Sequence, residues 1–259
     1  MKERALDRDN NKKQKKENFL VSIVWIIFLA LLFRSFAFGS YNIPSGSMLR
    51  TLHEGDYIFV SKWAYGYSRH SLPFSIPIIP NRLFANKPER GDVAVFKLPT
   101  DNRTDYIKRI IGLPGDTIQV VNGQVVLNGK TLEYNYKENY QINRFKNPKK
   151  TSQGCLNEKT KVYEEILPNG VSYEILNTFN NLPQDNTSVY RVPKDHYFLM
   201  GDNRDNSQDS RFLKKVGFVP FENLVGQAGI IFFSWHWKKV GKNLCLSNVK
   251  WNRAFQLIK

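Results

Sequence analysis

The apolar stretch of residues 19–38 constrains the architecture of this chain more than any other feature of its sequence. Residues 19–33 read FLVSIVWIIFLALLF, in which Ser22 is the one polar side chain, and Arg34 and a second short apolar run complete the stretch. A continuous helix here would rise about 30 Å, the thickness of the hydrocarbon core of a bilayer, with Arg34 near the far end, where its side chain reaches the headgroups. We therefore predict one transmembrane helix over residues 19–38.

The segment before this stretch is basic and sets the expected orientation. Its lysines and arginines outnumber four acidic residues; they are Lys2, Arg4, Arg8, Lys12, Lys13, Lys15 and Lys16. Basic flanks stay on the cytoplasmic side, so residues 1–18 are expected inside and everything after Gly39 outside. The alternative is a cleavable signal peptide, for which Ala37-Phe38-Gly39 offers a weak cleavage site. We favour a retained, single-pass anchor.

Composition excludes several other classes of protein. With 259 residues, 41% of them hydrophobic, the chain can bury a substantial core and is not disordered. Its net charge of +15 suits nucleic acid or an anionic membrane. Because the charge is spread along the chain and the body is expected outside the cytoplasm, we expect contact with membrane lipid and no nucleic-acid partner. Cys155 and Cys245 form no C-x-x-C pair, so neither a metal nor a cofactor is expected.

The sequence after the anchor predicts a mostly β fold. The strongest hairpin signals are Asn122-Gly123 and Asn128-Gly129, each beside apolar runs. Short runs rich in β-branched and aromatic residues predict strands over 56–61, 92–97, 106–111, 117–121, 124–127, 161–166, 171–176, 196–200 and 228–235.

A change of composition suggests that the β core is discontinuous. Residues 130–190 are rich in Asn, Lys, Glu and Tyr and carry only weakly alternating strands, so we predict an inserted β subdomain there. The catalytic β core then comprises residues 39–129 and 191–259.

A turn just after the anchor carries two hydroxyls, Ser45 and Ser47, and a serine nucleophile needs a neighbouring base. The chain offers four histidines, His53, His70, His196 and His236, none of which stands in an orienting motif with Asp, so a Ser-His-Asp triad is unsupported.

The alternative base lies in the charged pair Lys108-Arg109, which interrupts a strand-like apolar run. Strand periodicity places the two side chains on opposite faces and leaves open which is buried. A buried lysine can lose its proton at working pH whereas arginine does not, so Lys108 is the candidate base.

Residues 201–211 contain no apolar side chain and follow an apolar strand directly. A calcium loop does not fit, because the closing Glu is absent at the required spacing. The Ser, Asp and Arg side chains could instead form a hydrogen-bonded network that orients a lysine.

Four stretches occur in order behind the predicted anchor: Pro44-Ser45-Gly46-Ser47-Met48, Arg90-Gly91-Asp92-Val93-Ala94-Val95-Phe96, Tyr106-Ile107-Lys108-Arg109 with Gly112-Leu113-Pro114-Gly115-Asp116, and Gly201-Asp202-Asn203-Arg204-Asp205-Asn206-Ser207. Together they resemble the bacterial type I signal peptidases. The resemblance covers roughly residues 40–120 and 190–225.

The resemblance implies a role for each candidate residue. Ser47 would be the nucleophile and Lys108 the general base, while the Ser45 hydroxyl and the Ser47 backbone N–H would form the oxyanion hole. Ser207 would hydrogen-bond the lysine, and Asp209 and Arg211 would support this arrangement. No metal or cofactor is implied.

It also implies a membrane-tethered, antiparallel β catalytic core with a β-ribbon insert, on the outer face of the bacterial inner membrane. The implied substrates are exported preproteins, cleaved after small residues in an A-x-A-like site, and we expect a monomer. Ile43, Met48 and Phe59 are candidates for the substrate pockets. The alternatives are another Ser-Lys peptidase and a non-catalytic, membrane-tethered binding protein.

Two positions depart from the family pattern. Arg50 stands where the family commonly has Pro, which removes a backbone restraint three residues after Ser47. The link from Arg211 to Gly217-Phe218-Val219-Pro220 is a few residues longer than usual. Many members also have two anchors, and one is predicted here.

Overall fold

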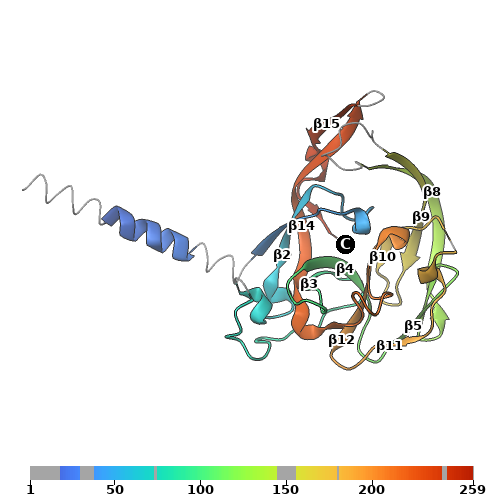
Figure 1. Ribbon diagram of the computed structural model, residues 1–259, viewed down its shortest axis with the longest axis horizontal. Coiled ribbons are helices and arrows are strands. Elements are labelled where there is room, and N and C mark those ends of the chain that lie inside the picture. Colours follow the sequence, from blue (N-terminus) through green and yellow to red (C-terminus); the bar gives the residue numbers. More distant parts are fainter. Residues whose placement is uncertain are drawn as a thin grey trace, which may run out of the picture.

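The computed structural model describes residues 18–29, 38–72, 75–144, 156–179, 181–240 and 244–258. Residues 18–29 are helical, and almost all regular structure after residue 38 is β (Figure 1). The predicted membrane segment, residues 19–38, lies partly outside these ranges. Within them, the helix is too short to meet the length of a membrane span.

The largest sheet has nine strands and carries the residues of the candidate site. Its main path runs β1-β2-β14-β3-β4-β12-β13, and β15 and β16 pair with β14. Every pairing in it is antiparallel. The strands are β1 (Phe38–Asn42), β2 (Asp56–Ser61), β3 (Val93–Lys97), β4 (Asp105–Gly112), β12 (His196–Met200), β13 (Val219–Pro220), β14 (Leu224–Val240), β15 (Leu244–Val249) and β16 (Gln256–Leu257).

Two smaller antiparallel sheets flank it, with strand orders β11-β5-β6-β7 and β10-β9-β8. Their strands are β5 (Thr117–Val121), β6 (Gln124–Leu127), β7 (Lys130–Thr131), β11 (Tyr190–Arg191), β8 (Glu133–Arg144), β9 (Leu156–Ile166) and β10 (Ser172–Leu176). Figure 1 shows the pairs β14–β15 and β8–β9 on opposite sides of the body.

Short 3-10 turns connect the strands: η1 (Gly46–Met48), η2 (Lys62–Ala64), η3 (Arg69–Ser71), η5 (Pro183–Asp185), η6 (Arg204–Asn206), η7 (Phe221–Asn223) and η8 (Trp251–Arg253).

The Asn-Gly dipeptides form the turns that the sequence predicts. Asn122, Gly123, Asn128 and Gly129 all have positive φ, between 49° and 79°, as the tight hairpin turns require. β5 and β6 pair from Ile118↔Leu127 to Val121↔Gln124, and their apolar side chains alternate between core and surface. This hairpin is confirmed.

Other strands are longer than predicted. β14 extends over 17 residues, against the eight of the predicted strand, because it pairs in succession with β3, β2 and β15. Register shifts next to Leu224, Ala228 and Ile231 mark bulges, which bend a strand and let it serve several partners. β8 was not predicted, because polar residues occupy both of its faces and leave only a weak alternation of apolar and polar side chains.

The buried core is divided among several clusters. One contains Ile43 and Met48, which lie before and after Ser47 in the chain, packed with Ile58 and Val60 of β2. Another joins the flanking sheets to β4 and β12, and a smaller one joins Leu49 to strands β8, β9 and β10. The segment around Ser47 is thus anchored in apolar packing on both sides.

At Gly226 the backbone of β14 lies so close to β2 that a side chain would not fit. A Cβ at this position would lie 2.5 Å from the carbonyl oxygen of Ser61, whereas at Gly229 the nearest atom would be 3.8 Å away. We expect Gly226→Ala to lower the free energy of unfolding by about 1–3 kcal/mol and Gly229→Ala to change it by less than about 0.5 kcal/mol. Urea denaturation of both variants measures the difference. Equal effects of the two substitutions would contradict the close contact between Gly226 and the Ser61 backbone.

Candidate functional site

Ser47 lies in the turn η1, between β1 and β2, and its side chain is almost completely buried. Ser45 directly precedes the turn in an extended conformation and is exposed. The two hydroxyl oxygens lie 3.4 Å apart, so both face the same small region.

Lys108 projects from the middle of β4 toward this turn. Its Nζ lies 2.7 Å from Ser47 Oγ and donates to the carbonyl of Ile107 at 2.7 Å. The side chain is 3% exposed. The two residues, 61 positions apart in sequence, are therefore brought into direct contact in a water-poor site.

The strand pattern left open which member of the pair Lys108-Arg109 is buried, and the structure buries both. Arg109 is 0% exposed. Its guanidinium donates to both carboxylate oxygens of Asp202, at 2.9 and 2.8 Å, and to the carbonyl of Gly91. It also lies over the ring of Tyr173, 4.1 Å from the centroid. The side chains on both faces of β4 are therefore covered.

Burial changes the protonation of Lys108. Loss of hydration lowers the pKa of its amine from 10.5 to about 8, although the charges of Asp209 and Asp202 raise it. Asp202 is already held by Arg109 in a two-point ion pair. About a tenth of Lys108 is therefore neutral at pH 7, and about half at pH 8.

The polar loop of residues 201–211 holds the backbone of the serine turn. Asn203 donates through its backbone N–H to Ser47 O at 3.0 Å and through Nδ2 to Gly46 O at 2.9 Å. Asp202 also accepts a hydrogen bond from the hydroxyl of Thr51. The loop thus fixes the turn from the side of β4.

Asp209 and Arg211 form a fully buried ion pair within the same loop. Arg211 donates to both carboxylate oxygens at 2.9 Å, and Asp209 accepts from the N–H of Gly201 at 3.1 Å. Burial alone would raise the pKa of Asp209, but the guanidinium of Arg211 holds it below its usual value. Asp209 thereby links the beginning of the loop, at Gly201, to its end, at Arg211.

Ser207 is also buried in the loop, packed against Gly201, where a Cβ would lie 2.2 Å from its hydroxyl oxygen. Among the residues that the structure describes, no hydrogen bond joins its hydroxyl to Lys108. Of the predicted supporting residues, Asp209 and Arg211 contact each other, while Ser207 is placed in the loop without contacting the lysine through a hydrogen bond.

The structure adds a third buried ion pair, between Arg204 and Glu165, which sequence reasoning missed. Arg204 of the loop donates to Glu165 of β9 at 2.7 Å, and the hydroxyl of Tyr173 donates to the same carboxylate at 2.8 Å. Arg204 also donates to Gly201 O. Glu165 follows Glu164 directly, and no local pattern distinguishes the buried glutamate from a surface one.

His53, His70 and His196 form hydrogen bonds with residues other than Ser47. The backbone N–H of His53 donates to Asp56, the ring of His70 contacts Ser75, and the ring of His196 contacts the carbonyl of Lys194. Burial and the nearby Arg69 lower the pKa of His70 to about 4. The side chain of His236 lies outside the described part of the chain.

The pocket candidates differ in exposure. Ile43 and Met48 are buried in the core, and Phe59 is 38% exposed and stacks on Phe232.

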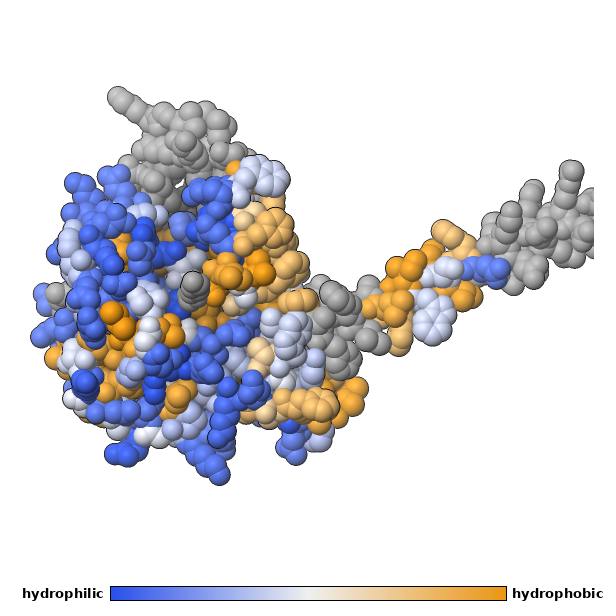
Figure 2. Space-filling view, turned by 180° about the vertical axis from the view of Figure 1, so that it is seen from behind, coloured by the Kyte–Doolittle hydropathy of each residue, from blue (hydrophilic) through white to orange (hydrophobic). Residues whose placement is uncertain are grey.

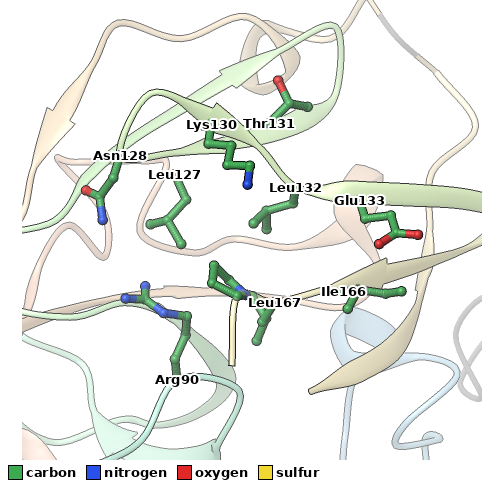
Figure 3. Close-up of a pocket in the computed structure, with 10 residues that line it drawn as sticks. Arg90, Leu127, Asn128, Lys130, Thr131, Leu132, Glu133, Ile166 and Leu167 are labelled. Carbon is green, nitrogen blue, oxygen red and sulfur yellow. The ribbon is translucent and has the colours of Figure 1, made fainter. Parts of the chain in front are cut away.

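A cavity of about 530 Å³ lies elsewhere, between β6–β7 and the end of β9 (Figure 3). Apolar Leu127, Leu132 and Leu167 share its wall with Arg90 and Lys130. None of its lining residues is a predicted site residue.

Comparison with known proteins identifies relatives of nearly the same length. Residues 16–235 match the family described as "Signal peptidase, peptidase S26". A signal peptidase I of Rickettsia typhi is 40% identical, covering 97% of this chain and 96% of that protein, and one of Rickettsia akari is 39% identical over 96% and 93%. A crystal structure of a signal peptidase I from Enterococcus faecalis is 24% identical, with a TM-score of 0.30, and covers 55% of this chain and 97% of that one.

The burial of Lys108 predicts a pH-dependent cost to folding. The unfolded lysine keeps its ordinary pKa of 10.5 and the folded one has a pKa of about 8, so folding at pH 7 must either expel a proton or bury a charge. Lys108→Met should therefore raise the free energy of unfolding at pH 7 by up to about 3 kcal/mol.

The gain should shrink as the pH rises from about 8 and vanish above about 10.5, where the lysine is neutral in both states. Chemical denaturation of both proteins across this range measures it. A stability difference that is independent of pH would contradict the lowered pKa.

Proposed function

The chain belongs to the signal peptidases of peptidase family S26 and is a serine endopeptidase, and from this we propose that it removes signal peptides with Ser47 as nucleophile and Lys108 as general base. The observation that carries the proposal is the 2.7 Å separation of Lys108 Nζ and Ser47 Oγ in a buried site. A serine becomes nucleophilic when an adjacent group accepts its proton, and a desolvated lysine with a pKa of about 8 can do so.

The chemistry follows the usual two steps of acyl transfer. Neutral Lys108 takes the proton of Ser47 as Oγ attacks the scissile carbonyl, and the resulting ammonium protonates the leaving amine of the mature chain. Lys108 then takes a proton from water, which attacks the acyl-serine and releases the signal peptide. The lysine ends neutral and the serine regains its hydroxyl.

Negative charge develops on the carbonyl oxygen during the attack, and hydrogen-bond donors must stabilise it. The Ser47 N–H and the Ser45 hydroxyl are proposed for this role, because Ser45 Oγ lies 3.4 Å from Ser47 Oγ and is exposed to an entering substrate. Ser207, Asp209 and Arg211 are proposed to support the site through the loop that holds the Ser47 backbone. We further propose cleavage after small residues in an A-x-A-like site, by a monomer.

The test is cleavage of a purified preprotein with an A-x-A site. The wild type should cut after the small residue, and Ser47→Ala, Lys108→Met and Lys108→Arg should each lose activity, the last because a guanidinium stays protonated. Activity that survives in Lys108→Met would refute the proposed base, and activity that survives in Ser47→Ala would refute the nucleophile.

The pH profile gives a second test. Since the neutral lysine is the active form, kcat/KM should rise by about tenfold from about pH 7 to about pH 9, following the pKa of about 8 in the substrate-free enzyme. A kcat/KM that is flat across this range would contradict a base with that pKa.

Contact with the membrane is the second part of the proposal. We propose that the chain is anchored by one span over residues 19–38, with residues 39–129 and 191–259 forming the catalytic core outside the cytoplasm and residues 130–190 inserted into it.

An exposed aromatic cluster lies next to this span. Phe38, at the end of the stretch, contacts Phe59 and Trp63, and all three are more than a third exposed. Figure 2 shows hydrophobic surface gathered along one side of the β body. Exposed aromatic clusters suit the lipid headgroup region.

If this cluster rests on lipid, Trp63→Ser should slow cleavage of a preprotein embedded in liposomes several-fold and leave cleavage of a soluble peptide unchanged. Phe179→Ser is the control, because Phe179 is similarly exposed and is separate from this cluster. Comparing the two rates for each variant measures the effect. An equal loss on both substrates would contradict a role in lipid contact.

A further inference from the structure

Two residues shortly after Ser47, Leu49 and Arg50, contact the three-stranded sheet β8–β10. Leu49 is buried in a cluster with Ile142 of β8, Val162 of β9 and Leu176 of β10. Each of the three strands therefore contributes one buried apolar side chain to the packing around Leu49. The inserted strands thus touch the chain two residues beyond Ser47.

The next residue, Arg50, has an unusual backbone. Its φ is +87°, in the left-handed region that favours glycine and that a long side chain rarely adopts. Leu52 closes the turn by donating to the carbonyl of Met48 at 2.7 Å. A non-glycine residue held in this conformation needs outside contacts that keep it there.

The guanidinium of Arg50 makes such contacts. Its Nε donates to Glu174 of β10 at 2.7 Å, and its Nη2 lies 2.6 Å from Glu174 and 3.1 Å from Glu138 of β8. It also lies over the ring of Tyr140, 4.7 Å from the centroid. β8 and β10 are the two outer strands of their sheet, so one side chain bridges it from edge to edge.

These ion pairs are suited to positioning more than to stabilising the fold. The side chain of Arg50 is 20% exposed and those of Glu138 and Glu174 are 55% and 41% exposed, so water and salt screen the attraction. The geometry is nevertheless specific, because a planar guanidinium is held by two carboxylates and a ring.

We propose that Arg50 is a positioning residue through which the sheet β8–β10 holds the Ser47 turn against Lys108. The inference rests on the proposed function, in which Ser47 Oγ must stay within reach of Lys108 Nζ. It also gives the inserted strands a task in the reaction, since their carboxylates fix the chain three residues after the nucleophile.

Arg50→Gly separates the ion pair from the backbone, because glycine adopts a φ of +87° without strain and lacks the guanidinium. With a soluble peptide substrate, kcat should fall about tenfold with KM unchanged. Glu174→Gln should lower kcat in the same direction. The double variant should be no slower than Arg50→Gly alone, because both changes remove the same interaction.

The matched control is Lys137→Gln, which breaks an ion pair of 2.9 Å with Glu164 on the same sheet. It should leave kcat unchanged. An equal loss in Lys137→Gln, or a rise in KM at constant kcat in Arg50→Gly, would overturn the proposal, the first by showing a general effect on the sheet and the second by showing direct contact with substrate.

A readout that does not need catalysis separates this proposal from the proposed function. Hydrogen exchange of the Leu52 amide, which closes the turn, should be faster in Glu174→Gln than in the wild type and unchanged in Lys137→Gln. Unchanged exchange in Glu174→Gln would overturn the proposal. A wild type that cleaves no preprotein would refute the proposed function, and this exchange measurement would then decide the coupling alone.

Discussion

The buried ion pair between Arg109 and Asp202 is the contact on which the rest of the site depends. Removing either charge would leave the other unpaired in a region without water, which costs several kcal/mol, so the two must be in place together. Arg109 follows Lys108 on β4, and Asp202 precedes Asn203, which binds the backbone of the serine turn. The pair thereby fixes the strand that carries the amine relative to the loop that holds the hydroxyl. It also engages the carboxylate of Asp202 directly, leaving Lys108 with serine and carbonyl partners.

Local signals in the sequence were enough for much of the fold. A tight type I′ hairpin turn requires positive φ at both central residues, which Asn122 and Gly123 adopt readily, so β5 and β6 were predicted to the residue. β8 was missed, because a strand with polar residues on both faces has no apolar period. The full length of β14 was also missed, since its partners are set by strands distant in sequence and not by its own residues.

The candidate site shows the same division. The residue types and their resemblance to a family gave Ser47 and Lys108, but their contact spans 61 residues and no pattern within the sequence measures it. Periodicity could not choose between Lys108 and Arg109, and the structure shows why: both faces of β4 are covered. Arg204 and Glu165 were missed as a pair because their contact joins the polar loop to β9, which is distant in sequence. Long-range electrostatic partners of this kind are decided by the folded state.

The place of β14 in the large sheet has a consequence for the order of assembly during synthesis. β2 follows the serine turn and β3 leads into the lysine strand, yet β14 lies between them and pairs with both. A ribosome delivers β2 and β3 long before β14. The edges of β2 and β3 that pair with β14 therefore stay unpaired until the chain has emerged beyond residue 234. Forming such contacts between strands distant in sequence is slow. The arrangement delays the meeting of serine and lysine until nearly the whole polypeptide has been made.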